Sequence, residues 1–235
     1  MHRILLLLLP FSIPLLLNAQ EADTLCGGYF SFLEGSLYEY AYYDKNDNFQ
    51  SRVRSEVMFV DPVEGEEGTY VATMESRIFD EYDEQVMDGQ YDVFCASGTY
   101  RTDFSNLINP AFKMSSLNAS MEVTSTELVL PSEIQEGQEL TEARTSVTVS
   151  SGGVDLLTTE IVVYNRKVEK RESVTTEAGT FDCFKITFDQ DVKTILKKTV
   201  SGAEWWAPGV GMVKSETYKK NGKLDGYAEL AVFDR

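Results

Sequence analysis

The chain of 235 residues carries 38 acidic and 21 basic side chains, which gives a formal net charge of −17 at pH 7. This balance argues against binding to nucleic acid and to anionic membrane surfaces, because both require a positively charged footprint. The only histidine is His2, so Ser-His-Asp and Cys-His catalysis and His-ligated zinc are excluded for the rest of the chain. Carboxylate, lysine and tyrosine chemistry stay open.

Residues 1–19 predict a secretory signal peptide. A basic start at Arg3 is followed by an almost wholly apolar run over residues 4–17, and the small residue Ala19 marks the expected cleavage point. The apolar run is shorter than the ~20 residues that span a bilayer. We expect residues 20–235 to form a single exported β domain, periplasmic or extracellular, without a transmembrane segment.

The rest of the chain predicts a series of short strands. Runs rich in Tyr, Phe, Val and Thr alternate with polar residues and are separated by turn-forming Gly, Asp and Asn. This pattern predicts an all-β, mainly antiparallel fold, either an open or half-closed β-barrel or a sandwich, built as a meander. The strands expected before the C-terminal hairpin cover residues 37–43, 49–60, 70–79, 91–95, 99–103, 127–131, 145–150, 154–168, 180–188 and 195–203.

Two stretches interrupt the strand pattern. Residues 87–89, Met-Asp-Gly, predict a turn because Asp and Gly favour turn conformations. In residues 104–116 the apolar side chains Phe104, Leu107, Ile108 and Phe112 recur at helical spacing. One short helix is therefore expected over 104–116, with a structured loop as the alternative.

The three cysteines are Cys26, Cys95 and Cys183. An oxidising compartment favours one disulfide and one leftover thiol, and spacing alone allows three pairings. We favour Cys26–Cys95, because that bridge would hold down an N-terminal segment that otherwise frays. Cys183 lies in an apolar strand, where a buried free thiol is ordinary.

The C-terminal region is organised around a predicted hairpin. Asn221-Gly222 between two strand-forming runs predicts a two-residue turn, since both turn positions need a positive φ. Paired residue numbers then sum to 443. Lys214 faces Glu229 and Tyr218 faces Asp225 in this register. We expect the Lys214–Glu229 pair to be structural, with an energy of roughly 0.2–1 kcal/mol.

Trp205-Trp206 precedes a bend at Pro208-Gly209 that delivers the chain into the hairpin. Consecutive residues of an extended strand point to opposite faces, so we expect one tryptophan in the core and the other at a rim. The buried tryptophan should cover a face of small and apolar side chains. That face comprises Gly211, Val213, Ser215, Gly226, Ala228 and Leu230.

Three segments together resemble one known family: Ala178–Ile186 (AGTFDCFKI), Trp206–Glu216 (WAPGVGMVKSE) and Gly222–Tyr227 (GKLDGY). The chain resembles exported Bacteroidota proteins that carry a TapB-like domain of unknown function. Members often have Trp-Tyr or Trp-Phe where this chain has Trp205-Trp206, which keeps the aromatic character. The resemblance implies an exported, mostly antiparallel β domain and no activity.

Three functions fit these observations. A non-catalytic binding module would use 13 Phe, 12 Tyr and 2 Trp to line a barrel for an apolar or amphiphilic ligand, although the same side chains can simply fill a core. A structural or adaptor subunit would dock on an envelope protein. A hydrolase would pair Glu160 with a second carboxylate, and nothing marks that pair. No catalytic, metal-binding or cofactor-binding residue is predicted. A retained small molecule would favour the first function, and a co-purified protein the second.

Overall fold

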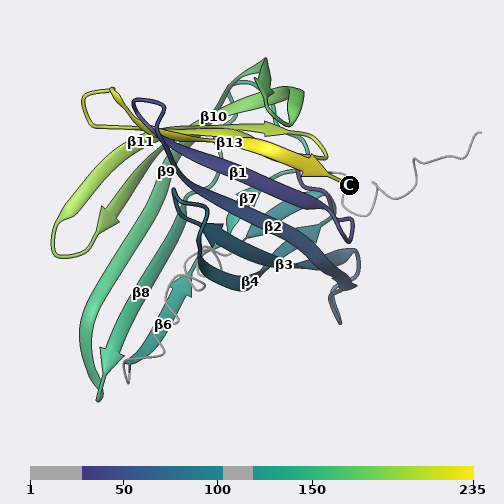
Figure 1. Cartoon of the computed structure of the whole chain (residues 1–235). Helices are drawn as coiled ribbons and strands as arrows, with labels where there is room; N and C mark the ends of the chain where they lie inside the picture. The colour runs from purple at the N-terminus through teal and green to yellow at the C-terminus, as the bar shows by residue number, and fades with distance from the viewer. Residues whose placement is uncertain (1–27, 103–118) are drawn as a thin grey trace, which may run out of the picture.

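The computed structural model describes residues 28–102 and 119–235. Their strands form one antiparallel sheet of 13 strands that curls into a nearly closed barrel, so the predicted all-β class is confirmed (Figure 1). The helix predicted over 104–116, the signal peptide over 1–19 and Cys26 lie outside the described residues. The strands are β1 (Leu37–Asp44), β2 (Phe49–Pro62), β3 (Thr69–Phe79), β4 (Gln85–Ala96), β5 (Thr99–Thr102), β6 (Ala119–Ser125), β7 (Leu128–Leu130), β8 (Ala143–Ser151), β9 (Val154–Thr176), β10 (Gly179–Lys193), β11 (Lys197–Ala207), β12 (Gly211–Tyr218) and β13 (Leu224–Asp234).

Most neighbours in the sheet are also neighbours in the sequence. The order is β6-β8-β9-β10-β11-β12-β13-β1-β2-β3-β4-β5-β7. The first and last strands pair with each other, from Leu37 opposite Asp234 to Asp44 opposite Gly226. The two edges of the sheet are β6 and β7, which follow one another in the chain.

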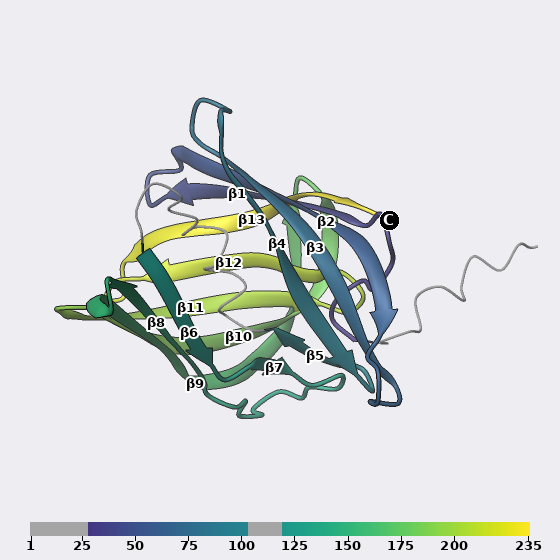
Figure 2. The same ribbon diagram turned by 90° about the horizontal axis from the view of Figure 1, so that it is seen from below.

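Antiparallel pairing sends the connecting turns to two opposite ends of the barrel (Figures 1 and 2). The plugged end holds residues 28–36 and the turn over residues 207–211, where the Gly209 N–H donates to the carbonyl of Gly28 at 2.8 Å. The open end holds the turns that join β1 to β2, β3 to β4, β8 to β9, β10 to β11 and β12 to β13. The bend predicted at Pro208-Gly209 is confirmed.

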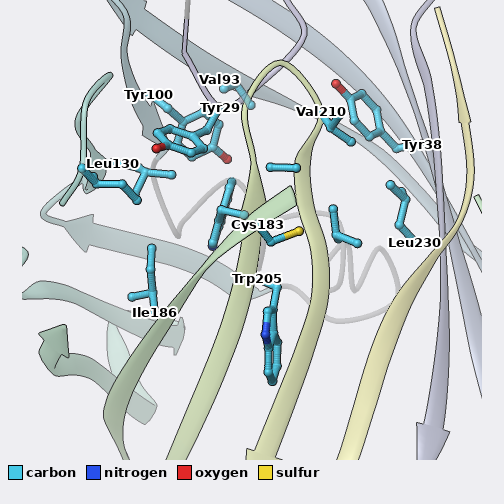
Figure 3. Close-up of a cluster of buried hydrophobic side chains, with 14 of the residues drawn as sticks. Tyr29, Tyr38, Val93, Tyr100, Leu130, Cys183, Ile186, Trp205, Val210 and Leu230 are labelled. Atoms are coloured by element: carbon cyan, nitrogen blue, oxygen red, sulfur yellow. The ribbon is translucent and has the colours of Figure 1, made fainter. Parts of the chain in front are cut away.

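Aromatic packing closes the plugged end. Tyr29 and Phe32 are buried, and the ring of Phe30 stacks on Tyr38 with centroids 5.1 Å apart. The hydroxyl oxygen of Tyr38 accepts a hydrogen bond from the Ser31 N–H at 3.1 Å. Figure 3 shows Tyr29 and Tyr38 together with the buried side chains of the strands that surround them. The segment before β1 is thus part of the core.

A buried arginine holds the seam between the short edge strand β7 and the long strand β9. Arg166 is only 3% exposed, and its Nη1 donates to the carbonyls of Val129 and Thr141, each at 3.0 Å. Desolvation lowers the pKa of Arg166 from its ordinary value. The two hydrogen bonds compensate part of the cost of burying this side chain, because buried polar groups need partners.

Some predicted boundaries are wrong. Residues 87–89 lie inside β4, where Asp88 pairs with Arg77 of β3, and the turn falls at Asp80–Glu84 instead. β9 continues to Thr176, beyond the predicted strand end at residue 168. β6 lies where no strand was predicted. Ladder pairing on a wide sheet outweighs the weak turn preferences of single residues.

The hairpin register is confirmed from Lys214, opposite Glu229, to Thr217. The two-residue turn at Asn221-Gly222 is wrong, because the register shifts by one residue after Thr217. Tyr218 therefore pairs with the residue before its expected partner, Asp225. A wider turn carries the chain between the strands, and it still uses the positive φ of its glycine, which is 75°.

The small-residue face predicted for the hairpin is buried in its central part. Val213 and Leu230 are 0% exposed, and Ala228 is 1% exposed. Gly211 at the plugged end takes a φ of 117°, in the region that favours glycine. Packing of the hairpin onto the core thus follows the alternation that the sequence shows.

The expectation of one buried and one rim tryptophan is wrong. Trp205 and Trp206 are 6% and 7% exposed, so both are in the core. The register shifts between them, since Trp205 faces Lys214 and Trp206 faces Met212. A β-bulge at this point breaks the strict alternation of faces on which the expectation depended.

Of the three cysteines, Cys183 is a free, buried thiol, as predicted. Burial raises its pKa to about 12, so the thiol stays protonated at neutral pH. Cys95 is completely buried in β4. Because Cys26 lies outside the described residues, the Cys26–Cys95 disulfide stays a prediction.

Candidate functional site

The barrel contains a cavity of about 400 Å³. Its lining comes from strands far apart in the sequence, namely β1 to β5, β7, β11 and β12, together with the segment before β1. Aromatic side chains dominate one part of the wall, with Met74, Met212 and Leu128 adding apolar surface. The aromatic lining residues are Phe30, Tyr38, Tyr40, Tyr42, Tyr91, Tyr100 and Trp206.

The cavity runs from the aromatic plug toward the open end. At the plugged end Phe30 contacts Tyr100, with ring centroids 5.8 Å apart, and Tyr100 contacts Trp206 at 5.5 Å. Toward the open end the lining residues Tyr42 and Asp88 are exposed to solvent. Among the described residues, the wall is therefore aromatic at the plugged end and reaches solvent at Tyr42 and Asp88.

Glu204 is a carboxylate inside this cavity. The β11 ladders place it between Ile186 of β10 and Ser215 of β12. Its Oε2 accepts a hydrogen bond from Trp206 Nε1 at 2.9 Å. Desolvation raises the pKa of Glu204 above its ordinary value, while the Trp206 hydrogen bond and the charge of Arg166 act in the opposite direction. Removal from bulk water is the larger effect.

Hydroxyl groups supply most of the other polar atoms of the wall. Tyr40 donates its hydroxyl to the carbonyl of Met212 at 2.8 Å, and Ser55 donates to the Oγ of Ser76 at 3.1 Å. Burial raises the pKa of Tyr40 and of Tyr91, so both phenols are neutral at physiological pH. The wall can therefore exchange hydrogen bonds with a ligand without changing its own charge.

The charge of the wall is one-sided. Among the described residues that line the cavity there is no lysine or arginine, whereas Glu204 and Asp88 are both acidic. A ligand with an anionic headgroup would have to enter an environment without a cationic partner, which is unfavourable in a poorly solvated site. The lining favours a molecule whose polar group is neutral or positively charged.

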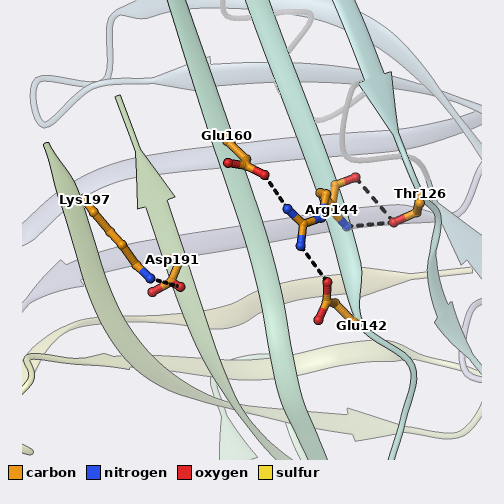
Figure 4. Close-up of polar contacts among 6 residues, drawn as sticks. All are labelled: Thr126, Glu142, Arg144, Glu160, Asp191 and Lys197. Atoms are coloured by element: carbon orange, nitrogen blue, oxygen red, sulfur yellow. Dashed lines mark hydrogen bonds and ion pairs between the residues drawn. The ribbon is translucent and has the colours of Figure 1, made fainter. Parts of the chain in front are cut away.

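The hydrolase hypothesis can be compared with the surroundings of Glu160. Arg144 lies between two carboxylates: its Nη1 bonds to Glu160 and its Nη2 bonds to Glu142 at 3.1 Å (Figure 4). Nearby, Lys197 forms an ion pair with Asp191 at 2.7 Å. Glu142, Glu160 and Asp191 line one surface groove, and each has a basic partner there. Ion pairing alone explains this arrangement.

The predicted motif residues fall in three places. Trp206 lines the cavity, while Trp205 lies outside its lining and donates Nε1 to Glu172 at 2.8 Å. Lys214 forms ion pairs with Glu229 and Glu216, each at 3.2 Å, and its Nζ lies 5.7 Å from the centroid of the Trp205 ring. The remaining motif residues form turns: Pro208, Gly209 and Gly211 at the plugged end, and Asn221 and Gly222 at the open end.

Sequence reasoning did not identify Glu204 or the tyrosines of the wall. The only available signal was the alternation Tyr38, Tyr40, Tyr42, which places three tyrosines on one face of β1. Glu204 is one of 38 acidic residues and had no distinguishing neighbours in sequence. Its burial depends on β-strands that the chain brings together only when the barrel closes.

Two further observations concern only residues 28–102 and 119–235. No group of three or more His, Cys, Asp or Glu side chains has an arrangement suited to holding a metal ion. No helix is long and apolar enough to cross a membrane.

Comparison with known proteins gives matches to both a sequence family and a fold. No curated protein sequence matches the chain. A crystal structure from Bacteroides fragilis, of a protein described as exported and as having a YmcC-like fold, superposes with a TM-score of 0.72 at 19% identity, covering 89% of this chain and 100% of the other. A Parabacteroides distasonis protein described as a lipoprotein gives a TM-score of 0.71 at 23% identity, covering 89% and 99% of the two chains.

These two structures show that the barrel is a shared fold. At such low identities the likeness extends to the fold alone. The sequence match establishes the family, because residues 33–230, from before β1 to within β13, fit the profile of one family. The chain therefore belongs to the DUF3108-like family.

Proposed function

We propose that this protein is a non-catalytic binding module that holds an amphiphilic molecule in its barrel cavity, with the polar group of that molecule neutral or cationic. The observation that carries the proposal is an aromatic cavity of about 400 Å³ with Glu204 in its wall and no basic residue among the described lining residues. A cavity of this size falls within the roughly 300–1,000 Å³ of small-molecule sites.

The expected pose follows from the two ends of the cavity. An apolar chain would lie against the aromatic rings of Phe30, Tyr100 and Trp206 at the plugged end. A hydroxyl, amide or ammonium group would reach Glu204 or the tyrosine hydroxyls. Binding would gain from apolar burial at about 25 cal/mol per Å² and from one or two directed hydrogen bonds.

An envelope location belongs to the same proposal. The two similar structures are described as an exported protein and a lipoprotein, and residues 1–19 have the pattern of a signal peptide. We also propose that the chain is a TapB-like protein, on the basis of the three C-terminal segments that carry this resemblance. An exported barrel would meet amphiphilic molecules of the envelope rather than cytoplasmic metabolites.

The two tryptophans provide a test within one chain. Trp206 lines the cavity and Trp205 does not, although both are buried to the same degree. Bromine quenches indole fluorescence on contact, so delipidated protein would be titrated with a bromine-terminated long-chain alcohol. Trp205→Phe, which keeps Trp206, should be quenched. Trp206→Phe, which keeps Trp205, is the matched control and should retain its fluorescence.

The ligand class is tested by the charge of the probe. The alcohol and a bromine-terminated alkyl ammonium ion should quench Trp206 at lower concentrations than the corresponding fatty acid, and Glu204→Gln should weaken the preference for the ammonium ion. Equal or tighter binding of the fatty acid would overturn the assignment of the headgroup. Absence of quenching by all three probes, with native mass spectrometry detecting no complex, would overturn the binding function.

A further inference from the structure

Two hairpins at the open end carry aliphatic side chains that the fold leaves uncovered. Ile195 and Leu196, in the turn between β10 and β11, are 91% and 80% exposed. Val154 and Leu156, at the tip of the β8–β9 hairpin, are also exposed. Such clustered exposure has a cost in water and is typical of surfaces that contact another apolar phase.

The strand directions place these tips at the same end of the barrel as the solvent-exposed part of the cavity wall. β11 runs from Lys197 at the open end to Ala207 at the plug, and Glu204 and Trp206 on this strand line the cavity. The β8–β9 and β10–β11 tips project from the same end of the barrel, opposite the C-terminus (Figures 1 and 2). A surface in contact with these tips would therefore lie at the end of the barrel toward which the cavity opens.

Lysines surround the β10–β11 tip in a chain whose overall charge is −17. The β12–β13 turn adds a second group of lysines. This turn lies beside the β10–β11 tip, because β11 pairs with β12 as far as Ser201 opposite Tyr218. Three of these lysines have acidic partners. Lys197 lies 2.7 Å from the carboxylate of Asp191. Lys198 and Lys219 lie 3.8 Å and 3.2 Å from the carboxylate of Asp225. All six are solvent-exposed: Lys193, Lys197, Lys198, Lys219, Lys220 and Lys223.

Acidic residues occupy a different part of the same end. The β3–β4 turn carries Asp80, Glu81, Asp83 and Glu84, of which Asp83 forms an ion pair with Arg52 of β2. The open end thus has lysines at the β10–β11 tip and the β12–β13 turn, exposed aliphatic side chains at the β8–β9 and β10–β11 tips, and a group of acidic residues at the β3–β4 turn. This polarity would tilt the barrel so that the basic part meets an anionic surface and the acidic part stays in water.

The geometry points to a docking surface for a phospholipid bilayer with anionic headgroups, formed by the β10–β11 tip, the β12–β13 turn and the β8–β9 tip. Ile195 and Leu196 would enter the interface between headgroups and acyl chains. The lysines would remain at the level of the phosphates, since their long apolar stems let the ammonium groups reach water. The total charge of the chain argues against membranes, but attraction acts within a Debye length of ~8–10 Å and therefore depends on the local charge.

This docking would orient the open end of the barrel, and with it the cavity, toward the lipid phase. An amphiphile could then pass between bilayer and barrel without crossing bulk water. Membrane docking does not depend on the binding function proposed above, because it uses exposed side chains that do not line the cavity.

Vesicle co-sedimentation of the full mature chain tests the proposal. The protein should bind phosphatidylcholine vesicles that contain phosphatidylglycerol, and binding should weaken in pure phosphatidylcholine and at high salt. Ile195→Ser with Leu196→Ser should lower the partition coefficient about tenfold or more. Lys193→Gln with Lys220→Gln should lower it only on the anionic vesicles.

Phe59→Ser is the matched control. Phe59 is an exposed apolar residue, 56% accessible, on β2 toward the plugged end, and its replacement should leave vesicle binding unchanged. No sedimentation with either vesicle, or an equal loss in the Phe59 variant, would overturn the proposal. So would a dimer that Ile195→Ser with Leu196→Ser converts to a monomer in light scattering, since the tip would then be a protein interface. Quenching of Trp206 by the brominated alcohol should persist in the tip variant, which separates this test from that of the binding function.

Discussion

The indole N–H of Trp206 donates to the carboxylate of Glu204, two residues earlier on β11, at 2.9 Å. Both side chains line the cavity, so this contact fixes the orientation of the partly buried Glu204 carboxylate. The hydrogen bond also explains why an acidic residue is tolerated in a largely aromatic wall, since a buried charge requires a partner.

The partly buried Glu204 carboxylate should make stability depend on pH. The ordinary pKa of about 4.5 applies to Glu204 in the unfolded chain, and the folded-state pKa is higher. The folded state therefore binds the proton more tightly, so the stabilisation is fully present below pH 4.5 and is lost as the pH rises through the folded-state pKa. Thermal unfolding of Glu204→Gln and the wild type should show a difference that shifts in favour of the variant above pH 4.5 and then levels off. A difference independent of pH would contradict the burial of this group.

Replacing either tryptophan by alanine should be strongly destabilising. Each is a large side chain with less than a tenth of its surface exposed, so Trp205→Ala and Trp206→Ala should each cost about 3–5 kcal/mol in urea unfolding. Iodide should quench the fluorescence of neither in the native protein. Ready quenching of one tryptophan, or tolerance of its replacement, would show that it lies at an accessible rim.

The ion pairs of Lys214 should be unequal in their effect. Removing Glu229 leaves Glu216 as a partner at 3.2 Å, whereas removing Lys214 leaves both carboxylates and exposes the Trp205 ring. We expect Glu229→Ala to cost less than about 1 kcal/mol and Lys214→Ala about 1–2 kcal/mol. A double-mutant cycle with a coupling near zero would mean that the pair contributes only through side-chain packing.

Gly202 should not tolerate a side chain. A Cβ at this position would lie 2.3 Å from the tip of the Phe188 ring, which covers the glycine from the neighbouring strand. Gly202→Ala should therefore cost about 1–3 kcal/mol through overpacking. In a Phe188→Ala background the same replacement should cost much less. Equal costs in both backgrounds would place the strain in the backbone instead.

The fold class was predictable because it depends on local signals. The alternation of apolar and polar residues marks strands, and Gly, Asp and Asn mark turns, within a few residues of the chain. The pairing of Lys214 with Glu229 is an example, since the opposite charges agree with the register expected from Asn221-Gly222, although the turn itself is wider. Turn width was not predictable, because the register shift after Thr217 depends on how the strand twists against its neighbours. The bulge at Trp205-Trp206 arises in the same way.

The candidate site was much less predictable than the fold. Tyr40 of β1, Tyr91 of β4 and Glu204 of β11 meet only because the sheet closes on itself. A local pattern can show that each of them points to one face, but not that the faces enclose a common space. The lysines at the open end were missed for the same reason. The chain as a whole is acidic, and the lysines of the β10–β11 and β12–β13 turns come together only because β11 pairs with β12.

The pairing of β1 with β13 also has a consequence for the connectivity of the chain. Since Leu37 lies opposite Asp234, the start and the end of the barrel meet in adjacent strands. A circularly permuted chain could join its present C-terminus to the plug segment at Gly28 and begin instead between β6 and β7, the two free edges of the sheet. Every ladder would be kept. The position of the chain ends is thus not fixed by the architecture. The same barrel could fold from a chain that begins at a different strand.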